Sequence, residues 1–158
     1  METYILARAL HVLGVVLWIG GVAMVTTVLL PATRQLKTPQ ERVQFFERVE
    51  QRFAWQARAT TLLTGLSGFY MLYLLDAWSR YSTPAYWWIH AMTAVWAIFT
   101  LVLFVLEPLF LHRLFLRKAE ENPEKTFHII QTMHWILLSV SLITVFGAVA
   151  GSHGWVLQ

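Results

Sequence analysis

Four long apolar stretches dominate this chain and restrict what it can fold into. They cover about residues 4–30, 59–75, 85–111 and 127–150, and each approaches or exceeds the roughly 20 apolar residues that cross a bilayer as a helix. Only 13% of the residues are charged, against about 25% in a soluble domain. A soluble helical bundle needs a polar stripe on each helix, and residues 95–106 have almost none. We therefore predict an all-α, integral membrane four-helix bundle, formed as one domain by residues 1–158.

Prolines and capping residues mark the ends of the predicted helices. Pro31 is expected to close the first helix. Thr38 and Glu41 flank Pro39 in a capping-box pattern, so a second helix should begin there. That helix is too long for a bilayer, so its first half should form a cytoplasmic extension. Cap-then-proline pairs at residues 83–84 and 122–123 give predicted helices over about 4–30, 38–75, 84–112 and 123–150.

The basic residues fall almost entirely in two connections, after the first and after the third predicted helix. The short link between the second and third helices contains only Arg80, and residues 151–158 contain no Lys or Arg. The positive-inside rule then places both termini on the outer, periplasmic side of a bacterial cytoplasmic (inner) membrane. The first segment has no basic region before it and is too long for a cleaved signal peptide, so we expect a membrane helix there. The basic residues of the two connections are Arg34, Lys37, Arg42, Arg48 and Arg52, and Arg113, Arg117, Lys118 and Lys125.

Composition narrows the possible cofactors and partners. The chain has no cysteine, which excludes disulfides, thiolate zinc sites and iron–sulfur clusters. The net charge of +3 reflects membrane orientation, and we expect no nucleic-acid partner. The expected partners are membrane lipid and a quinone or respiratory redox protein, and the chain is compatible with a homo-oligomer.

Histidines lie inside the apolar stretches, where an ionisable side chain is costly and therefore indicates a functional site. His11 and His90 are predicted at similar depth below the outer surface, on the first and third helices. Two such imidazoles could ligate the iron of one haem b inside the bundle. Arg8, one turn outward of His11, and Arg80 could pair with the haem propionates. The alternative is that both histidines are packing residues.

Several residues share a face with the predicted haem ligands. Gly14 and Trp18 share a face with His11. Ala94 and Ala97 share a face with His90, and their small side chains leave room for a flat ring. Glycines at 21, 65, 68, 147 and 151 allow the close approach of a backbone or of a flat ligand, and helix packing is the commoner explanation for any one of them. His153, also on the outer side, is either a rival ligand or a solvated interfacial group.

The inner half of the chain offers a second, weaker site. His134 lies about two turns from the predicted inner face, with His112 and His128 near that surface. They could hold a second haem with Arg58 as the propionate partner, or they could simply be hydrated. Glu107, followed by a proline, is predicted to pair with Arg58 or Arg113. The alternative role for Glu107 is a proton relay to a quinone-type substrate.

Residues in the first two helices also have a recognisable spacing. They are His11, Gly14, Trp18, Gly20, Gly21 and Pro31, then Arg52-Phe53, Ala57-Arg58 and Leu63-Thr64-Gly65. This pattern resembles the CopD-like copper-resistance membrane proteins and the related HemJ-type protoporphyrinogen oxidases over roughly the first two-thirds of the chain. The resemblance implies a four- or five-helix bundle, and its HemJ branch implies haem b with His11 as a ligand. This chain has His90 where those families tend to carry a lysine, which favours two-histidine ligation.

Together these features predict a membrane cytochrome b that transfers electrons. Two strong imidazole ligands leave no open iron position for oxygen chemistry. One alternative is a HemJ-like protoporphyrinogen oxidase, an oxidoreductase that would use the same haem. Another is a copper transport or copper-resistance permease, which the scattered methionines and absent cysteines disfavour because they provide no cluster of soft ligands for Cu(I).

Overall fold

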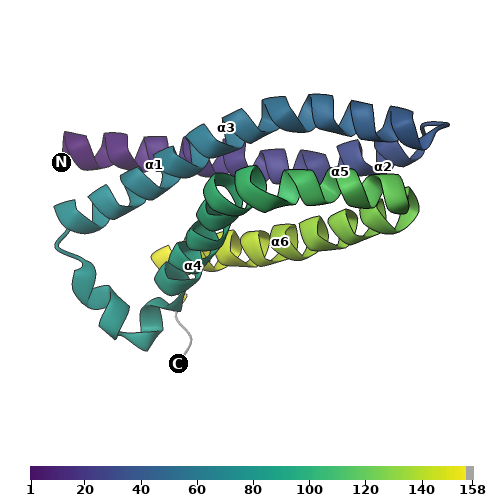
Figure 1. Ribbon diagram of the computed structural model, residues 1–158. Helices are drawn as coiled ribbons and strands as arrows, with labels where there is room; N and C mark the ends of the chain where they lie inside the picture. The colour runs from purple at the N-terminus through teal and green to yellow at the C-terminus, as the bar shows by residue number, and fades with distance from the viewer. Residues whose placement is uncertain (156–158) are drawn as a thin grey trace.

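Four long helices, joined by short connections, make up the computed structural model, which describes residues 1–155 (Figure 1). The predicted all-α class is confirmed, and no strand occurs among the described residues. The predicted domain also included residues 156–158, which lie outside the described part. The elements are α1 (Glu2–Met24), η1 (Val25–Leu29), α2 (Leu30–Arg34), α3 (Pro39–Leu74), η2 (Trp78–Ser82), η3 (Pro84–Tyr86), α4 (Trp87–Leu101), η4 (Val102–Leu111), α5 (His112–Glu121) and α6 (Pro123–Ser152).

Three of the four helices are long and apolar enough to cross a membrane. They are Glu2–Arg34, Pro84–Glu121 and Pro123–Ser152, and the first two extend beyond the ends predicted at about residues 30 and 112. The helix α3 has 36 residues but does not reach the same hydropathy. The predicted membrane helices are thus matched in three cases, and the second predicted span is the exception.

The exception arises from the polar face that α3 turns toward its neighbours. Thr60, Thr64 and Ser67 are buried, and each donates its hydroxyl to a backbone carbonyl of α3 itself. These hydroxyls lower the mean hydropathy of α3, although their hydrogen bonds are satisfied locally. The opposite face is apolar, with Leu62 and Leu66 exposed.

Pro31 does not end the first helix, because a π-helical segment accommodates it. In η1 the N–H of Leu30 bonds to the carbonyl of Val25, five residues earlier. Pro31 follows in this register and has no N–H, so the carbonyl of Thr26 lacks the amide donor that a π turn would supply. Gln131 of α6 donates its Nε2 to that carbonyl at 2.7 Å. A side chain from another helix therefore replaces the missing backbone hydrogen bond.

The predicted helix caps are confirmed at the starts of α3 and α6. Thr38 Oγ1 accepts from the N–H of Glu41 at 3.2 Å, and Glu41 Oε2 accepts from the N–H of Thr38 at 3.3 Å. Asn122 Oδ1 accepts from the N–H of Lys125 at 3.0 Å. These caps satisfy amides that the first turn of a helix leaves free.

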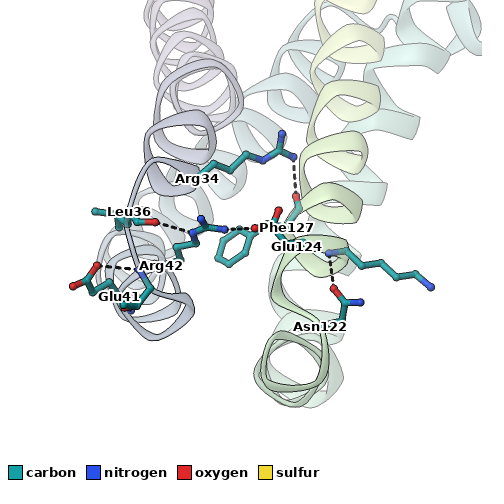
Figure 2. Close-up of polar contacts among 9 residues, drawn as sticks. Arg34, Leu36, Glu41, Arg42, Asn122, Glu124 and Phe127 are labelled. Atoms are coloured by element: carbon teal, nitrogen blue, oxygen red, sulfur yellow. Dashed lines mark hydrogen bonds and ion pairs between the residues drawn. The ribbon is translucent and has the colours of Figure 1, made fainter.

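The two basic connections lie together at one end of the molecule (Figure 2). Arg42 at the start of α3 pairs with Glu124 at the start of α6, with Nη1 and Oε1 2.6 Å apart. Arg42 also donates its Nε to the carbonyl of Leu36 at 3.0 Å. Arg34 at the end of α2 donates to the carbonyl of Phe127 at 3.4 Å. Most of the cations of the chain therefore gather at this end, which we call the basic end.

At the opposite end, which contains the N-terminus and residues 75–86, the helices form two pairs. The helix α1 packs along α3, and α4 packs along α6. In Figure 1 the C-terminal half of α3 and the N-terminal half of α4 diverge, with η2 and η3 between them. A core of Trp18, Val22, Val95, Phe99 and Leu138 joins α1, α4 and α6 nearer the middle.

Glycines mark the closest approaches between helices, as the sequence predicted. A Cβ at Gly65 would lie 2.3 Å from the ring of Trp96, one at Gly147 2.3 Å from Trp87 and one at Gly151 2.4 Å from Trp88. Each distance is too short for a real Cβ contact. The protein's own aromatic rings therefore occupy the space above these three glycines, which favours helix packing over a flat ligand there.

Candidate functional site

His11 lies half-buried between α1 and α3. Its Nδ1 is 2.9 Å from the carbonyl oxygen of Thr64 and 3.3 Å from Ser67 Oγ. A Cβ at Gly68 would lie 3.1 Å from Cε1 of the same ring, so the absence of a side chain at Gly68 makes room for the imidazole. A proton on Nδ1 satisfies the carbonyl of Thr64 and leaves Nε2 as the nitrogen with a free lone pair. This is the orientation that a metal-ligating histidine needs.

His90 lies in a different environment. It is exposed on α4 together with Ala94 and Ala97, on the side opposite the buried Trp88 and Val95. Its ring packs edge-on against Tyr81 of η2, with ring centroids 5.2 Å apart. The small side chains that were predicted to leave room for a cofactor therefore form an uncovered strip on α4.

The structure does not bring His11 and His90 together. Among the interactions of residues 1–155, the two rings share no neighbour. Between α3 and α4 lies Trp96, which covers Gly65 and donates its Nε1 to the carbonyl of Thr61 at 3.0 Å. The sequence predicted that His11 and His90 lie at a similar depth in the membrane. In the structure, their side chains have different neighbours.

The other predicted contributors to the outer site are spread over several surfaces. Arg8 is exposed on α1, and the guanidinium of Arg80 lies 5.3 Å from the centre of the Tyr86 ring. Trp18 is buried in the core, edge-on to Phe99 at 4.9 Å. His153 is exposed, and its Nδ1 lies 2.8 Å from a carbonyl of its own helix.

Gly14 supports the predicted site only indirectly. A Cβ there would lie 2.5 Å from Thr64 Oγ1 and 3.3 Å from the Thr64 amide. Thr64 is also the residue whose carbonyl contacts His11. Gly14 therefore sets the distance between α1 and α3 at the level of the His11 ring.

The three inner histidines are also separate from one another. His134 is partly buried, with Nδ1 2.9 Å from the carbonyl of Ile130 on its own helix. His128 is exposed on α6. His112 lies at the junction of η4 and α5, with its Nε2 3.8 Å from Glu47 Oε1. No contact among these three is present in residues 1–155.

Arg58 and Glu107 form the ion pair that the sequence offered as one of two options. Arg58 Nη2 donates to Glu107 Oε2, and both side chains are 22% exposed. Arg58 also donates its Nε to the carbonyl of Leu103 at 3.1 Å. Pro108 lies five residues after Leu103 inside the π-helical η4, so this carbonyl again lacks an amide donor. Arg58 is thus engaged by a carboxylate and by a backbone carbonyl, and its pairing with a haem propionate stays a prediction.

A cluster of carboxylates and one imidazole surrounds this ion pair. One ligand atom from each of Glu50, Glu107 and His112 lies within 4.8 Å of the other two, and Glu47 contacts His112 from the next turn of α3. Burial raises the pKa of Glu50, and the nearby charge of Glu107 raises it further. We call Glu47, Glu50, Glu107 and His112 the carboxylate–histidine cluster.

This cluster was not predicted from the sequence. Glu47 and Glu50 are one turn apart in a charged, helical segment, where such residues are usually solvated. Glu107 and His112 are five residues apart, and in an α-helix that spacing places them on different faces. The π-helical turn of η4 brings them together. A proline beside a buried carboxylate was the only local signal for it.

Comparisons with known proteins assign no relative to this chain: no family model, no curated protein and no solved structure matches it. The resemblance to the CopD-like and HemJ-type proteins therefore stays a prediction.

Proposed function

We propose that this chain is a multi-pass protein of the bacterial cytoplasmic membrane, with α3 as a fourth span and both termini outside. Two observations support it. The lipid-side residues of α3 are apolar, including Leu62, Leu66 and Tyr73. The basic connections lie at one end, as the positive-inside rule requires of a four-span protein. With only three spans, the two connections would lie on opposite sides of the membrane.

Because the chain has no cysteine, single cysteines can test this topology directly. Ser79→Cys lies in the connection between α3 and α4, and Gln40→Cys lies at the start of α3. In intact spheroplasts, a membrane-impermeant maleimide should label Ser79→Cys at once and Gln40→Cys only after lysis. Labelling of both variants, or of neither, before lysis would contradict a membrane-spanning α3.

For the function of the chain, we propose a cytochrome b that binds haem b near the outer face and transfers electrons, with His11 as an axial ligand. The observation that carries this is the His11 imidazole, whose Nδ1 contacts the Thr64 carbonyl while Nε2 has no hydrogen-bond partner in residues 1–155. In a membrane segment an imidazole held in this way is well suited to metal ligation. Haem, when bound, supplies one-electron chemistry. Thr64 and Ser67 of this chain orient the His11 imidazole.

We propose His90 as the second ligand, which requires its side chain to move. Its ring lies against Tyr81 on the exposed side of α4, so it must leave that contact to approach His11. The divergence of α3 and α4 at this end (Figure 1) identifies the place where the two helix pairs would have to rearrange. The two ligands can be tested separately.

The test is an absorbance spectrum of protein purified in detergent, reduced minus oxidised, with haem quantified as the pyridine haemochrome. We expect about one haem b per chain, and we expect His11→Ala to abolish it. His128→Ala, an exposed histidine at the basic end, is the matched control and should retain the haem. Protein without a Soret band, or a band that survives His11→Ala, rules out the proposal.

His90→Ala then decides the second ligand. Loss of the low-spin spectrum, with a shift to a high-spin form, would support two-histidine ligation. An unchanged spectrum would exclude His90 and leave His11 ligation intact.

A further inference from the structure

Three members of the carboxylate–histidine cluster have the donor set of a metal site and lie close to its spacing. Carboxylate oxygens and imidazole nitrogens bind first-row metals at about 2.0 to 2.2 Å, so three donors on one ion lie at most about 4 Å apart. The ligand atoms of Glu50, Glu107 and His112 lie within 4.8 Å of one another. Small side-chain rotations would bring all three donors onto a single ion.

The backbone holds two of these donors on one face. The N–H of His112 bonds to the carbonyl of Glu107, five residues earlier, at the end of the π-helical segment η4. This bond places the two residues one π turn apart, along the helix axis. Ordinary α-helical winding would rotate them onto different faces. Wide π turns are rare and are frequently found at functional sites.

The local charge also favours a cation. Three carboxylates, those of Glu47, Glu50 and Glu107, face one another in a partly buried space. Arg58 is the one arginine that contacts them in residues 1–155, and it pairs with Glu107. Arg58 also acts on Glu50, so three carboxylates share one arginine and one imidazole. A divalent ion would neutralise this excess negative charge.

We propose that Glu50, Glu107 and His112 bind a first-row divalent metal ion at the basic end of the molecule, with Glu47 positioned to orient His112. One imidazole with two carboxylates and no thiolate suits Zn²⁺, Mn²⁺ or Fe²⁺, and an imidazole ligand disfavours Mg²⁺ and Ca²⁺. This site is independent of the proposed haem, because none of its residues contacts His11 or His90. It adds a second chemical centre to the chain, on the opposite side of the membrane from the haem.

Arg58 competes with the metal for Glu107. The ion pair and the metal both use the Glu107 carboxylate. Metal binding therefore either reorients that side chain or divides its two oxygens between Arg58 and the metal. In the structure Arg58 contacts Glu107 and the carbonyl of Leu103. Removing Arg58 should therefore strengthen metal binding.

The experiment measures Zn²⁺ and Mn²⁺ binding to the full chain in detergent after removal of metals with EDTA, by calorimetry and by metal analysis after dialysis. We expect one ion per chain, with little competition from excess Mg²⁺. Glu50→Gln and His112→Asn should each weaken binding at least about tenfold, because loss of an outer-shell partner alone costs about 10- to 100-fold. The haem content should not change in either variant.

Two controls match these changes at exposed positions of the same end. Glu120→Gln removes an exposed carboxylate of α5, and His128→Ala removes an exposed imidazole of α6; both should bind metal as the wild type does. Arg58→Gln should bind more tightly, and a purely structural cluster would not show this gain. The proposal is overturned if folded wild-type protein binds no ion, or if Glu50→Gln and His112→Asn bind it unchanged.

Discussion

The two ends of this molecule differ in the contacts that supplement apolar packing. At the end with the N-terminus, helices approach through rings packed onto glycines, as in Trp96 over Gly65 and Trp87 over Gly147. At the basic end, an apolar cluster that includes Leu30, Phe46 and Phe127 is supplemented by ion pairs, such as Arg42–Glu124 and Arg58–Glu107. Packing depends on shape and tolerates few changes in volume. Ion pairs depend on charge, and their contribution falls as solvent exposure rises.

This difference also separates the two proposed centres. The end with the N-terminus offers one imidazole held by a carbonyl and a hydroxyl of α3, which suits a large flat cofactor that brings its own metal. The basic end offers several charged donors in one place, which suits a bare ion. Substitutions that change volume at one end and charge at the other separate these two contributions to stability.

The largest effect is expected from Gly14→Ala at the end with the N-terminus. The new Cβ would lie 2.5 Å from Thr64 Oγ1, with the Thr64 amide and the Thr60 carbonyl at 3.3 and 3.4 Å. Backbone atoms cannot rotate away, so α1 and α3 must separate. We expect a loss of about 2 to 3 kcal/mol in the free energy of unfolding, measured by thermal or SDS-induced unfolding in detergent.

Gly20→Ala is the matched control. Nothing lies within 4 Å of a Cβ at Gly20, and alanine favours a helix over glycine. This variant should be as stable as the wild type or slightly more stable. Equal destabilisation by both substitutions would show that backbone freedom, rather than the α1–α3 distance, sets the stability of this end.

A smaller effect is expected from Glu107→Gln at the basic end, measured on metal-free protein. The partner, Arg58, is only 22% exposed, so the substitution leaves a poorly solvated cation with a weaker acceptor. We expect a loss of about 1 to 2 kcal/mol.

Glu124→Gln is the comparison for this change. Glu124 is 79% exposed in its pair with Arg42, so the expected cost is below about 1 kcal/mol. High salt should reduce the effect at Glu124 more than the effect at Glu107. Equal costs would mean that burial does not distinguish the two ion pairs.

The sequence predicted the local caps and a few contacts between helices. The caps at Thr38 and Asn122 follow from local hydrogen bonding, and the glycine contacts follow from the absence of a side chain. The Arg58–Glu107 pair was one of two options, because a buried carboxylate needs a cation and few were within reach.

Features that depend on the three-dimensional path of the helix were not predictable in the same way. Pro31 was expected to end a helix, but the π turn of η1 and the amide of Gln131 compensate for it. Likewise, Glu107 and His112 share a face only because η4 is wound as a π-helix. The depth of His11 and His90 could be estimated from position along each helix, but the direction of the His90 side chain depends on how α4 packs.

The smallest effect, and the one of opposite sign, is expected from Glu50→Gln in the presence of EDTA. Burial and the charge of Glu107 raise the pKa of Glu50 in the folded chain. The folded protein therefore holds this proton at pH values where the unfolded chain has lost it, so wild-type stability falls as pH rises from the ordinary glutamate pKa through the raised value. Above that window Glu50→Gln should be more stable than the wild type, by less than about 1 kcal/mol because the site is partly solvated. Below it the two proteins should be equally stable.

Unfolding curves collected from pH 4 to pH 8 measure the difference in stability. A Glu50→Gln variant that is less stable than the wild type at neutral pH would show that attraction to Arg58 outweighs burial and the charge of Glu107.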